Sequence, residues 1–171
     1  MPGSIDIGGR QVGGGSPCFV IAEVGVNHNG DPARANELVD VAARVGADAV
    51  KFQAFTPSLV ASPNAPKAAY QVERDQSASQ AEMLARLALD PATFADLKAH
   101  ADAVGVSFIS SAFDDRSVAM LEAIDVPALK IASGELTNLP LLETMAATGR
   151  PLLMSTGMAD MAEVDEAVSA V

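Results

Sequence analysis

The chain has 171 residues, of which 49% are hydrophobic, and a formal net charge of −11. This length and composition predict one globular domain with a buried core, and the acidic balance argues against a nucleic-acid partner, which would require clustered Lys and Arg. A single cysteine, a first segment unlike a signal peptide and the lack of an apolar run of about 20 residues favour a soluble, cytoplasmic protein without a membrane partner.

The first segment, IDIGGRQVGGG, predicts a β-hairpin that turns at Gly8 and Gly9 and covers one end of a sheet. Five short apolar segments follow and predict strands. They span residues 18–25, 48–53, 106–113, 127–135 and 151–157.

Helices are expected between these strands. Asp31 and Asp90 each precede a proline, a typical helix start, and Gly46 and Gly105 end the two segments. Their predicted buried stripes are Leu38, Val39, Ala42 and Val45 in the first, and Phe94, Leu97, Ala101 and Val104 in the second. Shorter helices are expected from about residues 115, 139 and 159, so the class is α/β with a parallel sheet.

The connection over residues 54–89 is much longer than a usual loop between a strand and a helix, and residues 79–89 within it have a helical pattern. Loops at the carboxyl ends of parallel strands often carry binding residues. We therefore expect this connection to contribute to a site.

Two architectures have this alternation of elements. An open, doubly wound sheet of five strands fits the length, whereas a (β/α)₈ TIM barrel needs about 250 residues, so that this chain would supply only its first five units. Polar side chains follow all five strands, which favours the barrel, because there every strand end faces one mouth. The first turn, GVNHNGD, also lacks a dinucleotide-binding glycine pattern.

Lys51 and Lys130 each interrupt an apolar strand near its carboxyl end. Either lysine could form a structural ion pair, but an unpaired ammonium inside a barrel is costly, which favours a function. A Schiff base with a carbonyl substrate and the binding of a phosphate or carboxylate both use lysine. The neighbouring Ser111, Ser133 and Ser155 favour a cradle for a small dianion.

Glu23 and Glu135 lie at the same predicted mouth, where an acid can transfer protons. Gln53 is two residues after Lys51, hence on the same strand face, and is a candidate hydrogen-bond partner of a polar substrate. His28 and His100 have no metal-ligand spacing and are expected to be structural or solvated.

Five motifs in this order and spacing resemble the N-terminal half of the sialic acid synthases, a family that includes N-acetylneuraminate, legionaminic and pseudaminic acid synthases. The motifs are FVIAEVGVNHNGD, GADAVKFQ, FISSAFD, ALKIASGELTNLPLL and RPLLMSTGMA. The resemblance covers nearly the whole chain.

The resemblance implies a (β/α)₈ barrel that condenses phosphoenolpyruvate with an N-acetylated hexosamine, such as N-acetylmannosamine, and releases phosphate. It implies phosphoenolpyruvate binding by Lys51, Ser111, Lys130, Ser133 and Ser155, sugar binding by Gln53, and a further substrate contact at Phe113. Glu23 and Glu135 match the family's acids near the reacting carbons.

The resemblance also implies a Mn²⁺ or Mg²⁺ cofactor on histidines of later strands, a C-terminal antifreeze-like domain and a homodimer. Residues 1–171 are therefore expected to be the N-terminal part of the synthase barrel, without the later strands and that domain. Two positions depart from the family pattern. Ser111 and Ala112 replace its threonine and proline, and its loop asparagine is not recognisable around Arg74 and Asp75. A ligand-binding or assembly module without turnover and, less favoured, a Schiff-base aldolase are the alternatives.

Overall fold

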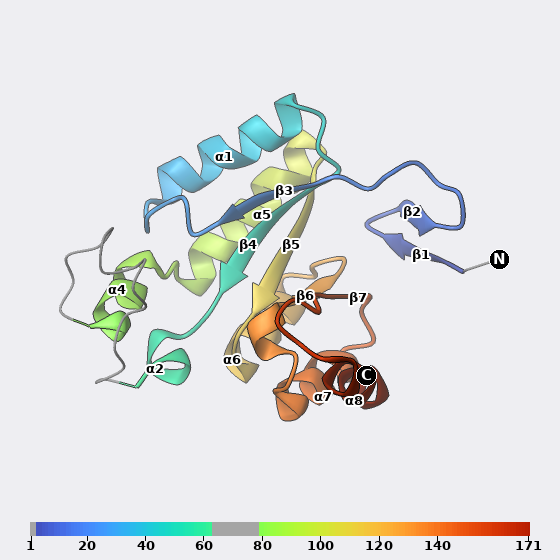
Figure 1. The fold of residues 1–171 in the computed structure, drawn as a ribbon. Coiled ribbons are helices and arrows are strands. Elements are labelled where there is room, and N and C mark those ends of the chain that lie inside the picture. The colour runs from blue at the N-terminus through green and yellow to red at the C-terminus, as the bar shows by residue number, and fades with distance from the viewer. Residues whose placement is uncertain (1–2, 63–78) are drawn as a thin grey trace.

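The computed structural model describes residues 3–62 and 79–171. A short hairpin precedes one curved parallel sheet, and helices cover a single side of that sheet (Figure 1). The strands are β1 (Ser4–Ile7), β2 (Arg10–Gly13), β3 (Ile21–Gly25), β4 (Ala49–Ala54), β5 (Ser107–Ala112), β6 (Leu129–Ile131) and β7 (Leu152–Met154). The helices are α1 (Pro32–Arg44), α2 (Pro57–Val60), α4 (Gln80–Leu87), α5 (Pro91–Val104), α6 (Asp115–Ala123), α7 (Leu139–Ala147) and α8 (Met161–Ala170), with a 3₁₀ turn η1 (Ser133–Glu135).

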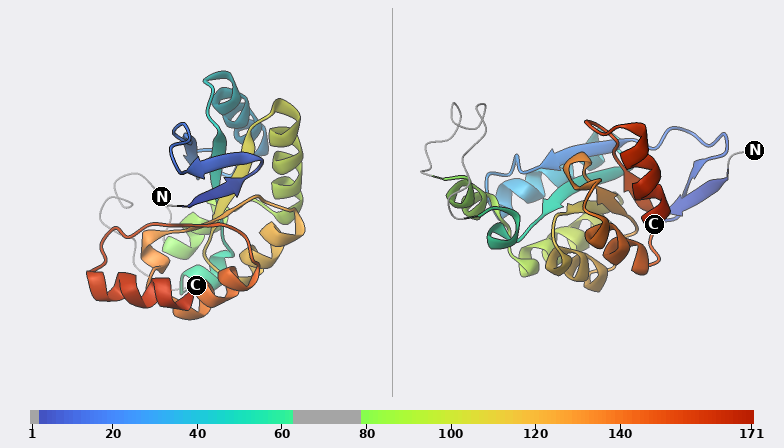
Figure 2. Two further views of the ribbon diagram at one scale, coloured as in Figure 1. Left: turned by 90° about the vertical axis from the view of Figure 1, so that its right-hand side faces the viewer. Right: turned by 60° about the horizontal axis from the view of Figure 1, so that its bottom comes forward.

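The order of the strands decides between the two architectures. The five parallel strands lie in the order β3-β4-β5-β6-β7, the same order as in the chain. Because each right-handed crossover then advances in the same direction, every connecting helix falls on the same face of the sheet. A doubly wound sheet would reverse direction once and place helices on both faces. The observed order is that of the first five units of a (β/α)₈ barrel, and Figure 2 shows the helices as an outer arc around the strands.

Aspartates begin most of the long helices by accepting hydrogen bonds from backbone N–H groups that have no partner within the helix. Asp31 accepts from Ala33 and Arg34, and Asp160 forms a reciprocal capping box with Glu163. Asp90 and Asp114 cap α5 and α6 in the same way. The helix starts expected from the sequence at Asp31 and Asp90 are confirmed.

The main core lies between the sheet and the outer helices. Phe52 and Phe108 are fully buried in neighbouring strands and stack with ring centroids 5.1 Å apart, and Phe94 of α5 meets Phe108 edge-on. The prediction that Val45 and Val104 belong to the buried helix stripes is wrong, because Val45 is 71% exposed and Val104 is 38% exposed. Each lies at the carboxyl end of its helix, where the chain turns back toward the next strand and leaves the sheet.

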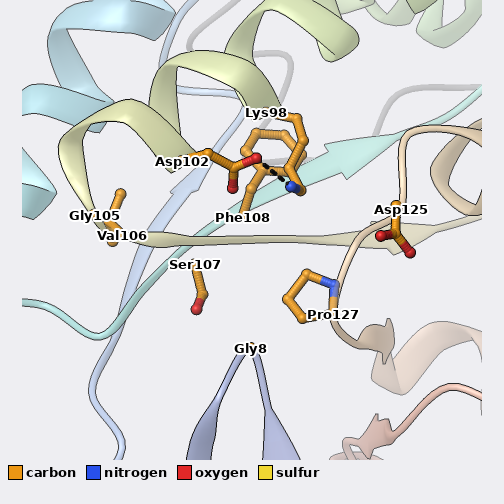
Figure 3. A pocket seen from close by; sticks show the side chains of 9 residues that line it. All are labelled: Gly8, Lys98, Asp102, Gly105, Val106, Ser107, Phe108, Asp125 and Pro127. Atoms are coloured by element: carbon orange, nitrogen blue, oxygen red, sulfur yellow. Dashed lines mark hydrogen bonds and ion pairs between the residues drawn. The ribbon is translucent and has the colours of Figure 1, made fainter.

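A smaller core fills the concave face of the sheet. Ile109 and Ala49 from the strands are fully buried there against Ile7 of the hairpin. Gly8 and Gly9 both have positive φ, as a tight two-residue hairpin turn requires. A side chain at Gly8 would lie 2.6 Å from Ser107 Oγ, so the hairpin tip sits directly on the start of β5 (Figure 3). The hairpin therefore closes the amino-terminal end of the strands, as expected from the sequence.

The first, fourth and fifth predicted strands are too long. The first was expected from residue 18, but β3 begins at Ile21, and the fifth was expected to reach residue 157, but β7 ends at Met154. The fourth was expected to run over residues 127–135, but β6 ends at Ile131 and the following residues form η1. Ser133 and Glu135 thus lie in a turn above the strand, where successive side chains do not alternate between two faces.

Candidate active site

The polar strand residues form two rows on the concave face, near the carboxyl ends of the strands. In the lower row Glu23 of β3 lies opposite Lys51 of β4. In the upper row Gln53 lies opposite Ser111, and Ser111 lies opposite Lys130. Four strands therefore place one acid, two lysines and two neutral polar groups on one surface, which the alternation of residues along each strand predicts.

Lys51 is the centre of the lower row. Its Nζ lies 2.6 Å from Glu23 Oε2 and donates a weak hydrogen bond to Ser111 Oγ at 3.5 Å. The lysine side chain is 12% exposed and the glutamate side chain 50% exposed. The ammonium is therefore buried among its partners, while the carboxylate of Glu23 reaches the open side of the mouth.

Lys130 occupies the neighbouring position in the upper row. Its Nζ donates to Ser155 Oγ at 2.6 Å and to the backbone carbonyl of Ile131. Burial lowers the pKa of Lys130, the positive charge of Lys51 lowers it further, and Glu23 partly opposes both effects. Two ammonium groups thus repel each other across a partly buried space, an arrangement that an anion would stabilise.

Ser133 and Glu135 lie in η1, directly after β6. A side chain at Gly157 would come within 3.6 Å of Ser133 Cβ, so the loop after β7 lies against Ser133. Glu135 accepts a hydrogen bond from Asn138 Nδ2 at 2.9 Å. Glu135 is therefore oriented by a residue of its own loop, whereas Glu23 is oriented by Lys51.

Gly25 lies where the acid and the glutamine meet, and the sequence analysis did not identify it. Its φ is +55°, and the pairing of β3 with β4 shifts between Glu23 and Gly25. A Cβ at this position would lie 3.0 Å from Glu23 Oε1 and 3.3 Å from Gln53 Nε2. The backbone conformation thus favours glycine, and a side chain here would also press on the tips of Glu23 and Gln53.

Asp114 is a second residue that the sequence analysis missed as a positioning group. It is 8% exposed and accepts hydrogen bonds from Thr56 N at 2.6 Å and from Ser117 N and Oγ, each at 2.9 Å. It therefore joins the loop after β4 to the start of α6. Its position directly after Phe113 in the motif FISSAFD was the available signal.

The described part of the long connection after β4 lies beside the carboxyl ends of β4 and β5. It contributes α2 and α4, and a side chain at Gly30 would clash with the backbone carbonyl of Arg86, so α4 packs closely on the loop after β3. Phe55 and Phe113, the residues directly after β4 and β5, meet edge-on with centroids 6.4 Å apart. Arg74 and Asp75, where the family asparagine was sought, lie outside the described residues.

His28 has a structural role. It is 1% exposed, stacks on Phe52, and its Nδ1 accepts a hydrogen bond from the backbone N–H of Gly30. Burial lowers its pKa, which favours the neutral ring. His100 pairs with Asp40 between two outer helices. Within residues 3–62 and 79–171 no group of three or more His, Cys, Asp or Glu has a metal-binding arrangement, and no helix there is long and apolar enough to cross a membrane.

Comparison with known proteins identifies the family. The NeuB family profile matches residues 38–171. N,N'-diacetyllegionaminic acid synthase from Legionella pneumophila is 44% identical over 93% of this chain and 45% of its own length, and human N-acetylneuraminate-9-phosphate synthase is 35% identical over 90% and 43%.

Among solved structures, the N-acetylneuraminic acid synthetase of Leptospira borgpetersenii, crystallised with citrate, superposes with a TM-score of 0.84 at 32% identity. That superposition covers 98% of this chain and 54% of the synthetase chain. The chain thus spans about half the length of the relatives it matches. The match over residues 38–171 establishes that this chain belongs to the NeuB family.

Proposed function

We propose that residues 1–171 are the N-terminal part of the barrel of a nonulosonate synthase, an enzyme that condenses phosphoenolpyruvate with an N-acetylated hexosamine and releases phosphate. The observation that carries the proposal is the convergence of Lys51 and Lys130 with Ser111 and Ser155 on one concave surface. Family membership supports the same reaction, because the related enzymes are named as synthases of sialic and legionaminic acids.

The lysine and serine side chains suit the phosphate and carboxylate of phosphoenolpyruvate. Lysines bind such groups as point charges, and serine hydroxyls donate hydrogen bonds to their oxygens. In the proposed complex Lys51, Lys130, Ser111, Ser133 and Ser155 share the two anionic groups. The negative charge of the bound anion offsets the repulsion between the two ammonium groups, so it favours the protonated form of Lys130.

The reaction then needs one new carbon–carbon bond and no covalent link to the enzyme. The methylene carbon of phosphoenolpyruvate attacks the sugar aldehyde, whose oxygen takes up a proton, and water adds to the cationic carbon that remains. The resulting tetrahedral intermediate breaks its carbon–oxygen bond to phosphate and becomes a 2-keto acid. Fixed cations and hydroxyls stabilise the charge that develops in these steps.

Glu23 is the proposed acid beside the anion site. In the free protein it is the counter-ion of Lys51, at 2.6 Å. An anionic substrate that takes over Lys51 releases the carboxylate of Glu23 toward the sugar or the attacking water. Gln53 and Phe113 bind the sugar in this proposal, and Glu135 is the second acid.

The divalent metal implied by the family does not fit the described residues of this chain. His28 is committed to backbone groups, and His100 lies on the outer helices. We therefore assign no step to the metal and propose no ligand for it among the described residues. The homodimer implied by the family belongs to the same proposal and is tested by sedimentation of the full-length protein.

The test is phosphate release by the full-length protein with phosphoenolpyruvate, Mn²⁺ and N-acetylmannosamine. We expect release that requires both substrates. Absence of release with N-acetylmannosamine, its 6-phosphate and related N-acetyl sugars refutes the proposal. Phosphoenolpyruvate binding without any turnover would indicate a ligand-binding module instead.

A Schiff-base aldolase is the second candidate, because the lowered pKa of Lys130 is the property that such a lysine needs. Borohydride reduction in the presence of pyruvate would then attach the substrate covalently to Lys130 or Lys51. Peptide mass spectrometry without a labelled lysine excludes this reaction.

A further inference from the structure

His28 is buried behind the strand that carries Lys51 and Gln53. It is 1% exposed, and its ring stacks on Phe52 with centroids 6.0 Å apart and planes 27° apart. Phe52 lies between Lys51 and Gln53 in β4, so its side chain points to the opposite face of the sheet. His28 therefore lies on the helix-covered face and does not reach a substrate in the mouth.

The loop after β3 brings His28 back beside Gly25. A turn in this loop is closed by the hydrogen bond from Asn27 N to Val24 O, at 3.0 Å. Gly25 is the register partner of Phe52, the residue on which the His28 ring stacks. The ring thus lies beside the pair of residues at which the β3–β4 ladder becomes irregular.

His28 holds the backbone of this loop at two points. Its Nδ1 accepts a hydrogen bond from Gly30 N at 3.0 Å, so the proton of the neutral ring is on Nε2. Burial lowers the pKa of His28, and a hydrogen bond with the backbone at Gly25 partly opposes this effect. Because only an acceptor favours the charged ring, that partner is the carbonyl of Gly25, which accepts from Nε2.

The conformation of Gly25 matters because two site side chains rest against it. A Cβ at this position would lie 3.0 Å from Glu23 Oε1 and 3.3 Å from Gln53 Nε2, so both tips lie close to the Gly25 backbone. Glycine has access to many backbone conformations, and its own structure does not select the observed φ of +55°. A hydrogen bond from a rigid, buried ring supplies that selection.

We infer that His28 is a positioning residue of the candidate site, which fixes the peptide of Gly25 and through it the tips of Glu23 and Gln53. The inference rests on the proposed function and adds a residue behind the sheet to it. His28 touches neither substrate nor reacting atoms, so its effect on the rate passes through Gly25. A role in stability alone would lower activity only as far as it lowers the folded fraction.

Three substitutions of His28 separate its two hydrogen bonds. In His28→Asn the side-chain oxygen takes the place of Nδ1 and accepts from the N–H two residues on, but the side chain is too short for the Gly25 carbonyl. In His28→Gln the amide takes the place of Nε2–H and keeps the bond to Gly25. His28→Phe keeps an aromatic ring against Phe52 and loses both hydrogen bonds.

The experiment measures phosphate release by the full-length variants with phosphoenolpyruvate, Mn²⁺ and N-acetylmannosamine, together with the Tm of each. We expect kcat/KM for the sugar to fall by about 10-fold or more in His28→Asn and His28→Phe, and to stay within about 3-fold of wild type in His28→Gln. Phosphoenolpyruvate affinity, measured by calorimetry, should change little, because Lys130 and Ser155 belong to other strands and pair with each other.

Phe94→Leu is the control for lost core packing. Phe94 is 2% exposed and meets Phe108 edge-on from α5, so its loss should lower the Tm and leave kcat/KM near the wild-type value. Equal kcat/KM in His28→Asn and His28→Gln, or wild-type kcat/KM in folded His28→Phe, overturns the inference and leaves the proposed function intact. If His28→Phe does not fold, the first comparison decides. No phosphate release by the wild-type protein refutes the proposed function itself, and this role of His28 with it.

Discussion

Replacement of Gly25 by alanine tests whether the β3 irregularity sets the geometry of the site. The backbone at φ +55° is strained for any residue with a Cβ, which costs about 1–2 kcal/mol of stability. The new Cβ would also lie 3.0 Å from Glu23 Oε1 and 3.3 Å from Gln53 Nε2. Both side chains must therefore move.

The stability and activity effects should separate. Glu23 is 50% exposed, so its carboxylate can swing into solvent, and loss of its pair with Lys51 adds at most about 1 kcal/mol. The same contacts require the tips of the proposed acid and the sugar-binding amide to shift by a few tenths of an ångström, and misplacement of groups that position a substrate lowers the rate. We expect kcat/KM for the sugar to fall by about 10-fold.

Gly149→Ala is the matched control. Gly149 has φ +67°, and nothing lies within 4 Å of its added Cβ, so it incurs the backbone cost alone. Denaturant unfolding of the full-length variants should give losses within about 1 kcal/mol of each other, while phosphate-release kinetics should be impaired in Gly25→Ala only. Equal kcat/KM for the two variants would refute the reasoning.

Three other predictions concern the lysines and the loop anchor. Lys51→Ala should raise the KM for phosphoenolpyruvate at least about 10-fold. The Tm should change little, because the ion-pair partner Glu23 is half exposed and can be solvated. As a control, Lys98→Ala on the outer helix α5 should leave that KM unchanged. Since the pKa of Lys130 is lowered, calorimetry should show phosphoenolpyruvate affinity falling as the pH rises through that lowered value, and Lys130→Arg should remove this fall. Over the interval from the lowered pKa to the ordinary 10.5 the unfolded chain binds more protons, so the contribution of Lys130 to the free energy of unfolding rises with pH. Asp114→Ala should lower the free energy of unfolding by about 2–3 kcal/mol, because it removes the cap of α6 and leaves Thr56 N–H without its acceptor. The neighbouring substitution Asp115→Ala, at an exposed position, should change the free energy of unfolding by less than about 0.5 kcal/mol.

Much of the site was visible as a pattern along the chain. Lys51 and Gln53 alternate with the fully buried apolar residues Val50, Phe52 and Ala54, and strand geometry alone places such polar residues on one face. Their contacts were not visible in this way. The pairing of Lys51 with Glu23 and that of Lys130 with Ser155 depend on the register between strands, which single-strand periodicity does not contain.

The sequence by itself determined the α/β class, the helix starts at Asp31 and Asp90, the hairpin turn at Gly8 and Gly9 and the family, because these depend on local chemistry and on long motifs. The tertiary structure decided the remainder. It alone established the strand order that separates a barrel from a doubly wound sheet, the 3₁₀ turn that carries Ser133 and Glu135, and an apolar cavity beside Gln53. The strand order and the cavity are made by segments far apart in the chain, so their energies lie in contacts that no local pattern encodes.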